Sequence, residues 1–272
     1  MIGAKVARNS IIKRSQFCEN DVEILSESSI PSFQRFFAKP YLRKSKMIEF
    51  DKNDMQSFTL LRFHIPFLMN FQGSALVIDP DIFQVKRGIE ELLDFDFNTH
   101  SLYARRGLQK NSWGSSAMLI SCDQLRHWSL DDLIDKLHHG KIDYDDLINL
   151  RLEEQSIGEL DKKWNEFDEI NQNTILLHTT EKITQPWRAG LNLNSSIPPL
   201  LKYIPRAPLY KLFGKDLTLG REHPHEGISN FFFNELAECI ASNIVSTEEL
   251  DDAIEKKYIR QDINHKIRPF KI

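Results

Sequence analysis

Two aspartates one residue apart, Asp79 and Asp81, have the residue type and spacing that suit metal-assisted chemistry. Carboxylate oxygens are ligands that Mg²⁺ and Mn²⁺ prefer. The pair follows the apolar run 74–78, which has the length and branched residues of a buried strand, and Pro80 cannot continue a central strand. The two carboxylates are therefore expected where a strand gives way to a loop, and a cation held there would be able to bind a diphosphate.

His178 is a candidate third ligand, because it ends a second apolar run at 174–177. In open α/β sheets, ligands collect beyond the carboxyl ends of the strands. The sequence therefore predicts that His178 lies near the aspartate pair. Each feature also has a plainer interpretation: acidic triplets are common in surface turns, and a lone histidine is often part of the core.

Strands and helices are expected to alternate along the chain. The predicted strands are 21–25, 74–79, 100–104, 116–121 and 174–177. The predicted helices are 7–15, 56–69 with a break near Pro66, 85–95, 129–139, 231–244 and 247–257. Thr247 is expected to cap the last of these helices, without a capping box. This alternation favours an α/β fold over a β-sandwich or a helix bundle.

Composition limits the classes of function and location. The 272 residues suffice for one large α/β domain or two small ones, and a net charge of -4 gives no case for nucleic-acid binding. Three distant cysteines argue against a disulfide framework and suit a reducing compartment. No apolar run is long enough to span a bilayer, and no signal-peptide segment is recognised, so a cytoplasmic location is expected.

Four segments, taken in order, resemble the retaining glycosyltransferases of family 8 and their bacterial relatives. These segments are 58–66, 75–81, 113–121, and 157–165 continuing to 178–187. The resemblance is good over residues 56–190 and loose outside them. It implies a GT-A fold, with a mixed, mostly parallel sheet flanked by helices. The catalytic domain would cover 1–190, and 191–272 would add an irregular cover and C-terminal helices to the same domain.

The resemblance also implies roles for single residues. Asp79, Asp81 and His178 would hold Mn²⁺ or Mg²⁺ against the donor diphosphate. Donor-binding roles would fall to Arg62, Ser115, Ser116 and Asp79, with Arg62 near the sugar or phosphate and the serine hydroxyls on the sugar. The implied activity is metal-dependent transfer of a hexose from a nucleotide diphosphate sugar, expected to be a UDP sugar. Transfer would retain configuration, and the acceptor would be an unknown glycan, lipid or protein.

The sequence departs from the family pattern in several places. Asp145 and Asp146 stand near the position of the group that flanks the reacting sugar carbon, so either is a tentative catalytic carboxylate; a solvated acidic face is the alternative. Gln185 stands where relatives often carry a phosphate-binding Lys, and Lys182 is a candidate replacement. Only nine residues precede Ser10, so the first, base-binding strand is expected to be short or missing.

Two other functions remain open. The first alternative is a non-catalytic relative that binds a nucleotide or glycan or acts as a scaffold. The second is a metal-dependent nucleotidyl- or phosphotransferase that uses the same aspartates. The C-terminal segment 256–271 mixes basic and aromatic residues. It is either a peripheral membrane contact, bound by charge and apolar burial, or a solvated tail.

Overall fold

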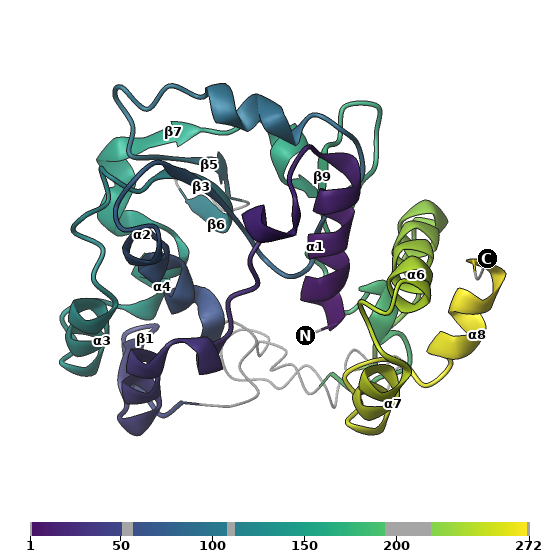
Figure 1. Ribbon diagram of the computed structural model, residues 1–272. Coiled ribbons are helices and arrows are strands. Elements are labelled where there is room, and N and C mark those ends of the chain that lie inside the picture. The colour runs from purple at the N-terminus through teal and green to yellow at the C-terminus, as the bar shows by residue number, and fades with distance from the viewer. Residues whose placement is uncertain (1, 51–56, 108–111, 194–218, 271–272) are drawn as a thin grey trace. The chain divides into compact units, whose positions relative to one another are not determined.

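The computed structural model describes residues 2–50, 57–107, 112–193 and 219–270 (Figure 1). The chain divides into two compact units. Unit 1 comprises Met1–Val22, Pro80–Arg87 and Glu166–Ile272, and unit 2 comprises Glu23–Asp79 and Gly88–Asn165. The chain thus passes from unit 2 to unit 1 at the peptide bond between Asp79 and Pro80. The predicted ranges 1–190 and 191–272 do not coincide with these discontinuous units and stay a prediction.

Unit 2 is built on a four-stranded sheet with the order β3-β6-β5-β7 (Figure 1). Its strands are β3 (Ser74–Ile78), β6 (Trp113–Ser121), β5 (Leu102–Arg106) and β7 (Ile157–Glu159). The long β6 pairs antiparallel with both β3 and β5, whereas β7 pairs parallel with β5. The last residue of β3, Ile78, pairs with Ala117, so β3 ends directly before the aspartate motif.

Short helices and a hairpin complete unit 2. The hairpin joins β1 (Tyr41–Arg43) to β2 (Lys46–Ile48), and the α-helices are α2 (Ile65–Leu68), α3 (Leu130–His138) and α4 (Tyr144–Ile148). The 3-10 segments are η2 (Glu27–Ser29), η3 (Pro31–Ala38), η4 (Ser57–His64), η5 (Ile89–Asp94), η6 (Arg151–Ser156) and η7 (Lys162–Trp164).

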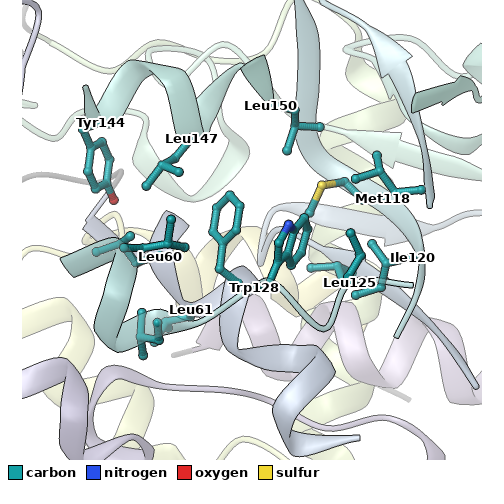
Figure 2. Packing of buried hydrophobic residues seen from close by; sticks show 14 of the residues in the cluster. Leu60, Leu61, Met118, Ile120, Leu125, Trp128, Tyr144, Leu147 and Leu150 are labelled. Atoms are coloured by element: carbon teal, nitrogen blue, oxygen red, sulfur yellow. The ribbon is translucent and has the colours of Figure 1, made fainter. Parts of the chain in front are cut away.

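Apolar side chains from β6, η4 and α4 form the core of unit 2 (Figure 2). Met118 and Leu147 are fully buried, and the Trp128 ring packs on Phe63 with the ring centroids 4.5 Å apart. Burial of each such side chain is worth about 1.5–3 kcal/mol. This core supports η4, which carries Arg62, and strand β3, which ends directly before Asp79.

Unit 1 contains the three-stranded sheet β4-β9-β8 and the terminal helices. Its strands are β4 (Ile82–Gln84), β9 (Leu176–His178) and β8 (Glu166–Phe167), and its short 3-10 turns are η1 (Glu19–Asp21), η8 (Pro186–Arg188) and η9 (Arg268–Phe270). The helices are α1 (Ile2–Arg14), α6 (Glu226–Ala241), α7 (Thr247–Glu255) and α8 (Ile263–Ile267). Helix α1 is fixed to β4, because the Gln84 N–H donates to Ser10 Oγ at 2.9 Å.

The predicted α/β class, with mixed sheets flanked by helices, is confirmed. The expectation of mostly parallel pairing is wrong for the described strands. Antiparallel pairs join β1 to β2, β3 to β6, β5 to β6 and β4 to β9, whereas the parallel pairs are β5 with β7 and β8 with β9. Short connections explain the antiparallel pairing of β1 with β2 and of β5 with β6, because a parallel pair needs a long crossover.

The strands predicted near 74–79, 100–104, 116–121 and 174–177 are present, and three other local predictions are wrong. No strand forms at 21–25, where Glu19–Asp21 is a 3-10 turn followed by irregular chain. Residues 85–95 form no amphipathic α-helix, because Val85 extends the β4–β9 ladder and only Ile89–Asp94 is helical, as a 3-10 segment. The cap of α7 is Ser246, which forms a capping box with Glu249.

The helix expected at 56–69 is a 3-10 segment, Ser57–His64, followed by α2. The predicted irregular cover at 190–227 lies largely outside the described residues. Within the described ranges, every helix is too short or too polar to cross a bilayer.

Candidate metal centre

The register of two antiparallel strands brings Asp81 and His178 together in unit 1. Ile82, the first residue of β4, pairs with His178 at the end of β9, and the Thr179 N–H donates to the Asp81 carbonyl at 3.2 Å. His178 Nε2 then lies 3.5 Å from Asp81 Oδ1. The predicted proximity of these residues is confirmed, although its cause is antiparallel pairing rather than the shared carboxyl ends of parallel strands.

Gln185 holds the other oxygen of the Asp81 carboxylate. Its side chain is buried, and its Nε2 donates to Asp81 Oδ2 at 2.9 Å and to the Thr179 carbonyl at 2.8 Å. One carboxylate oxygen of Asp81 thus faces an amide and the other faces the imidazole of His178. The sequence marked Gln185 only as a departure from a phosphate-binding Lys, and the structure gives it a contact with a candidate metal ligand instead.

Arg62, Asp79 and Ser115 form a buried polar network within unit 2. The Arg62 guanidinium donates to Asp79 Oδ1 and to Ser115 Oγ, and Ser115 Oγ donates to the Ile148 carbonyl at 2.7 Å. The Arg62 side chain is 8% exposed and that of Asp79 is 15% exposed. Arg62 therefore restrains the Asp79 carboxylate, and strand β6 and helix α4 supply the other contacts of the network.

Asp79, Asp81 and His178 each offer a ligand atom, and these atoms all lie within 4.8 Å of one another. Asp79 is tied to Asp81 through Pro80 alone, so the chain itself keeps their carboxylates near each other. Two carboxylates and one imidazole make a donor set that suits Mn²⁺ and, through its oxygens, Mg²⁺. Asp79 Oδ2 and Asp81 Oδ1 are the carboxylate oxygens to which Arg62 and Gln185 do not donate.

The remaining predicted site residues lie in unit 2, on β6 and α4. The Asp79 N–H donates to the Ser116 carbonyl at 2.8 Å. The Asn165 side chain donates through Nδ2 to Ser116 Oγ at 3.1 Å. Asp143 is the N-cap of α4, and Asp146 completes the capping box, because its Oδ2 accepts the Asp143 N–H at 3.0 Å.

Asp145, in the same helical turn as Asp146, lies with Oδ1 3.7 Å from Arg43 Nε. The described contacts of Asp146 are thus structural, whereas the side chain of Asp145, which is half-buried like that of Asp146, is not part of the capping box.

Sequence reasoning missed a second polar cluster behind His178. The Asp168 N–H donates to the His178 carbonyl at 2.9 Å, and Thr180 Oγ1 donates to the Asp168 carboxylate. His223 Nε2 lies 3.5 Å from Asp168 Oδ1. These contacts order the chain on both sides of His178. The polar residues at 178–180 were the only signal in the sequence, since Asp168 and His223 are distant along the chain.

No protein-family model and no curated protein sequence matches the chain. Among solved structures, it is similar to an active-site mutant of LgtC, with a TM-score of 0.45 and 13% identity over 68% of this chain and 85% of that one. It is similar to the glycosyltransferase GlyE of Streptococcus pneumoniae TIGR4, with a TM-score of 0.44 and 15% identity over 68% and 53% of the two chains.

The bifunctional glycosyltransferase WbbM gives a TM-score of 0.43 and 14% identity over 69% of this chain and 45% of that one. The chain thus spans about half the length of GlyE and less than half that of WbbM. Matches at this level do not establish membership of a family.

Proposed function

We propose that this protein is a metal-dependent glycosyltransferase of the GT-A fold that transfers a hexose from a nucleotide diphosphate sugar, expected to be a UDP sugar. Transfer would retain the configuration at the sugar carbon, and the acceptor would be a glycan, a lipid or a protein. The observation that carries the proposal is the convergence of Asp79, Asp81 and His178, with their ligand atoms within 4.8 Å of one another.

Two buried side chains would prepare the metal ligands before the cation arrives. Gln185 fixes one oxygen of Asp81, and Arg62 fixes one oxygen of Asp79. Partners of this kind orient metal ligands and tune their affinity. A bound Mn²⁺ or Mg²⁺ would neutralise charge on the departing diphosphate.

The donor sugar would contact unit 2, where Ser115 and Arg62 share a hydrogen bond. Ser116 would offer its hydroxyl beside Asn165, as the sequence resemblance implies. Asp145 is our preferred carboxylate for stabilising positive charge at the sugar carbon, because the Asp146 carboxylate is occupied in the capping box of α4. A carboxylate near an oxocarbenium-like centre favours cleavage of the glycosidic bond.

The test is release of UDP from a panel of UDP-hexoses by the purified protein with Mn²⁺. Asp81→Asn should abolish metal-dependent release, whereas the matched control Asp132→Asn should behave as the wild type, because Asp132 is an exposed helix residue paired with Lys136. Equal release by wild type and Asp81→Asn would contradict the proposal.

A binding protein without transfer activity is the second candidate, and the buried Gln185 in place of a phosphate-binding Lys favours it. Such a protein would bind UDP with Mn²⁺ but release no product from any UDP-hexose. A nucleotidyl- or phosphotransferase would instead be stabilised more by a nucleoside triphosphate than by a diphosphate sugar, which a thermal-shift comparison would reveal.

Peripheral membrane contact through 256–271 stays a prediction. Several basic side chains in the described part of this segment are already in ion pairs: Lys256 with Asp252, Arg260 with Glu222 and Asp262, and Lys266 with Glu222. These pairs lower the positive charge that the segment offers to an anionic lipid surface.

A further inference from the structure

Three consecutive apolar side chains are exposed at the end of α2 in unit 2. Phe67 is 57% exposed, Leu68 is 42% exposed and Met69 is 40% exposed. Single exposed apolar residues are ordinary on protein surfaces, whereas adjacent ones form a patch that marks an interaction site. In the rest of the described chain, the large exposed apolar residues are separate from one another in the sequence: Met47, Leu93, Leu152, Ile170, Leu219 and Tyr258. We call residues 67–71 the α2 tip.

Backbone hydrogen bonds fix the conformation of the α2 tip. The Phe71 N–H donates to the Pro66 carbonyl at 2.7 Å, and the Asn70 N–H donates to the Phe67 carbonyl at 2.9 Å. This pair of bonds is the Schellman ending of a helix. Asn70 and Phe71 have φ angles of 51° and 54°, in the left-handed region that a bulky residue rarely adopts. A specific turn, rather than a frayed helix end, therefore keeps the apolar side chains on the surface.

The directions of the three side chains favour one kind of partner. Successive residues of a helical turn point about 100° apart, so Phe67, Leu68 and Met69 spread around the helix axis. A groove in a protein partner takes side chains that lie three or four residues apart on one face of a helix. A lipid interface surrounds an inserted turn on all sides, so it contacts all three side chains at once.

The charges near the α2 tip suit an anionic lipid surface. Residues 55–78 contain no acidic side chain. Arg126 is exposed, its guanidinium lies 5.5 Å from the centre of the Phe71 ring, and its Nη2 donates to the Phe71 carbonyl at 3.4 Å. Asp123, an exposed acid near Arg126 in the sequence, accepts from Ser121 Oγ at 3.2 Å. A cation at the base of an apolar tip can reach lipid phosphates while the apolar side chains enter the acyl boundary.

The α2 tip is separate from the candidate metal centre. Strand β3 begins after the tip at Ser74 and ends directly before Asp79. A strand of this length spans about 17 Å, so the tip and Asp79 lie at opposite ends of β3. The exposed side chains are therefore not explained by binding of a donor at the metal ligands.

We propose that Phe67, Leu68 and Met69 insert into the interfacial region of a bilayer that contains anionic lipid, with Arg126 at the headgroups. This contact is distinct from the one predicted for 256–271, where several cations are already paired within the protein. Three side chains and one cation make a reversible peripheral contact. The inference is independent of the proposed function, because it requires neither a metal nor a nucleotide.

The experiment is sedimentation of the full chain with vesicles of phosphatidylcholine and phosphatidylglycerol, without Mn²⁺. The combined variant Phe67→Ser, Leu68→Ser and Met69→Ser should bind at least about tenfold more weakly than the wild type, because the inserted apolar area is removed. Arg126→Gln should weaken binding to these vesicles by about fivefold and leave binding to pure phosphatidylcholine unchanged. The matched control Leu93→Ser, which removes an isolated exposed side chain of unit 2, should stay within about twofold of the wild type.

Three results would overturn the inference. The first is equal vesicle binding by the wild type and the combined variant, or no binding by the wild type. The second is a loss in Tyr258→Ser that the combined variant does not share, which would place the membrane contact in 256–271. The third is a dimer in sedimentation equilibrium that the combined variant converts to a monomer, because a second copy of the chain would then cover the α2 tip.

Insertion can also be measured directly with a fluorescent side chain at the α2 tip. Leu68→Trp should be quenched by lipids brominated in their acyl chains more strongly than the wild type is. The control Leu93→Trp should be quenched no more than the wild type. The native background is low, because Trp113, Trp128 and Trp164 are buried. Equal quenching of Leu68→Trp and Leu93→Trp would contradict insertion of the tip.

Discussion

Replacing Gln185 by Leu removes the side chain that fixes Asp81 and keeps a similar volume. Two hydrogen bonds are lost, one to a carboxylate and one to the Thr179 carbonyl. Bonds to charged groups are worth about 1.5–3 kcal/mol and neutral bonds about 0.5–1.5 kcal/mol. Gln185 Oε1 is buried and has no hydrogen-bond partner in the described part of the chain, so its removal offsets some of the loss.

The free energy of unfolding should fall by about 1–3 kcal/mol. This figure is the energy of the two lost hydrogen bonds, reduced because the buried Oε1 without a hydrogen-bond partner is also removed. For a chain of this size that corresponds to a fall in Tm of about 3–10 °C. Affinity for Mn²⁺ should also fall, by about 10- to 100-fold, because Asp81 loses its orienting partner.

Differential scanning calorimetry and titration with Mn²⁺ measure the two effects. The matched control is Gln124→Leu, which removes an exposed amide bonded to the Phe97 carbonyl at 2.9 Å and should change stability by less than about 0.5 kcal/mol. A Gln185→Leu protein that is less stable but binds Mn²⁺ as the wild type does would refute the orienting role.

Three further predictions concern single charged residues. Arg62→Met should lower the free energy of unfolding by about 3–5 kcal/mol in chemical denaturation, because it leaves the Asp79 carboxylate without its buried partner; a loss below about 1 kcal/mol would contradict this. A hydrogen bond from Arg260 lowers the pKa of Glu222 from 4.5 to about 2, so Glu222 stabilises the fold above pH 4.5 and this contribution is lost as pH falls toward 2. Glu222→Gln should lack that part of the acid dependence in pH-dependent thermal melts, and an unchanged profile would count against the pair. Asp145→Asn should reduce sugar release from UDP-hexoses at least tenfold, by analogy with general catalytic carboxylates, and leave Tm within about 2 °C; full activity would exclude Asp145 as the catalytic carboxylate.

Local sequence patterns were sufficient for the elements that end next to the metal ligands. The apolar run before Asp79 is β3, the run before His178 is β9, and Pro80 interrupts the ladder as its missing N–H requires. Ser129 caps α3, since its side chain accepts from the Asp132 N–H. Each of these features depends on neighbours within a few residues.

Apart from the proximity of Asp81 and His178, features that depend on distant parts of the chain were not predicted. The triplet Ile82–Gln84 forms β4 only because β9, more than ninety positions later, pairs with it. Residues 21–25 alternate between polar and apolar side chains, but they pair with no strand in the described part of the chain and form no strand themselves. In the sequence, Gln185 is only a residue that differs from the Lys of the family pattern. The fold shows that its side-chain amide donates to Asp81.

Titration of the purified protein with Mn²⁺, by calorimetry and electron paramagnetic resonance, tests the central claim most directly. The account predicts one Mn²⁺ per chain, tighter binding when UDP is present, and loss of binding in both Asp81→Asn and His178→Ala. Wild-type Mn²⁺ binding in both variants, or no binding by the wild type with UDP present, would contradict a metal centre built from Asp79, Asp81 and His178.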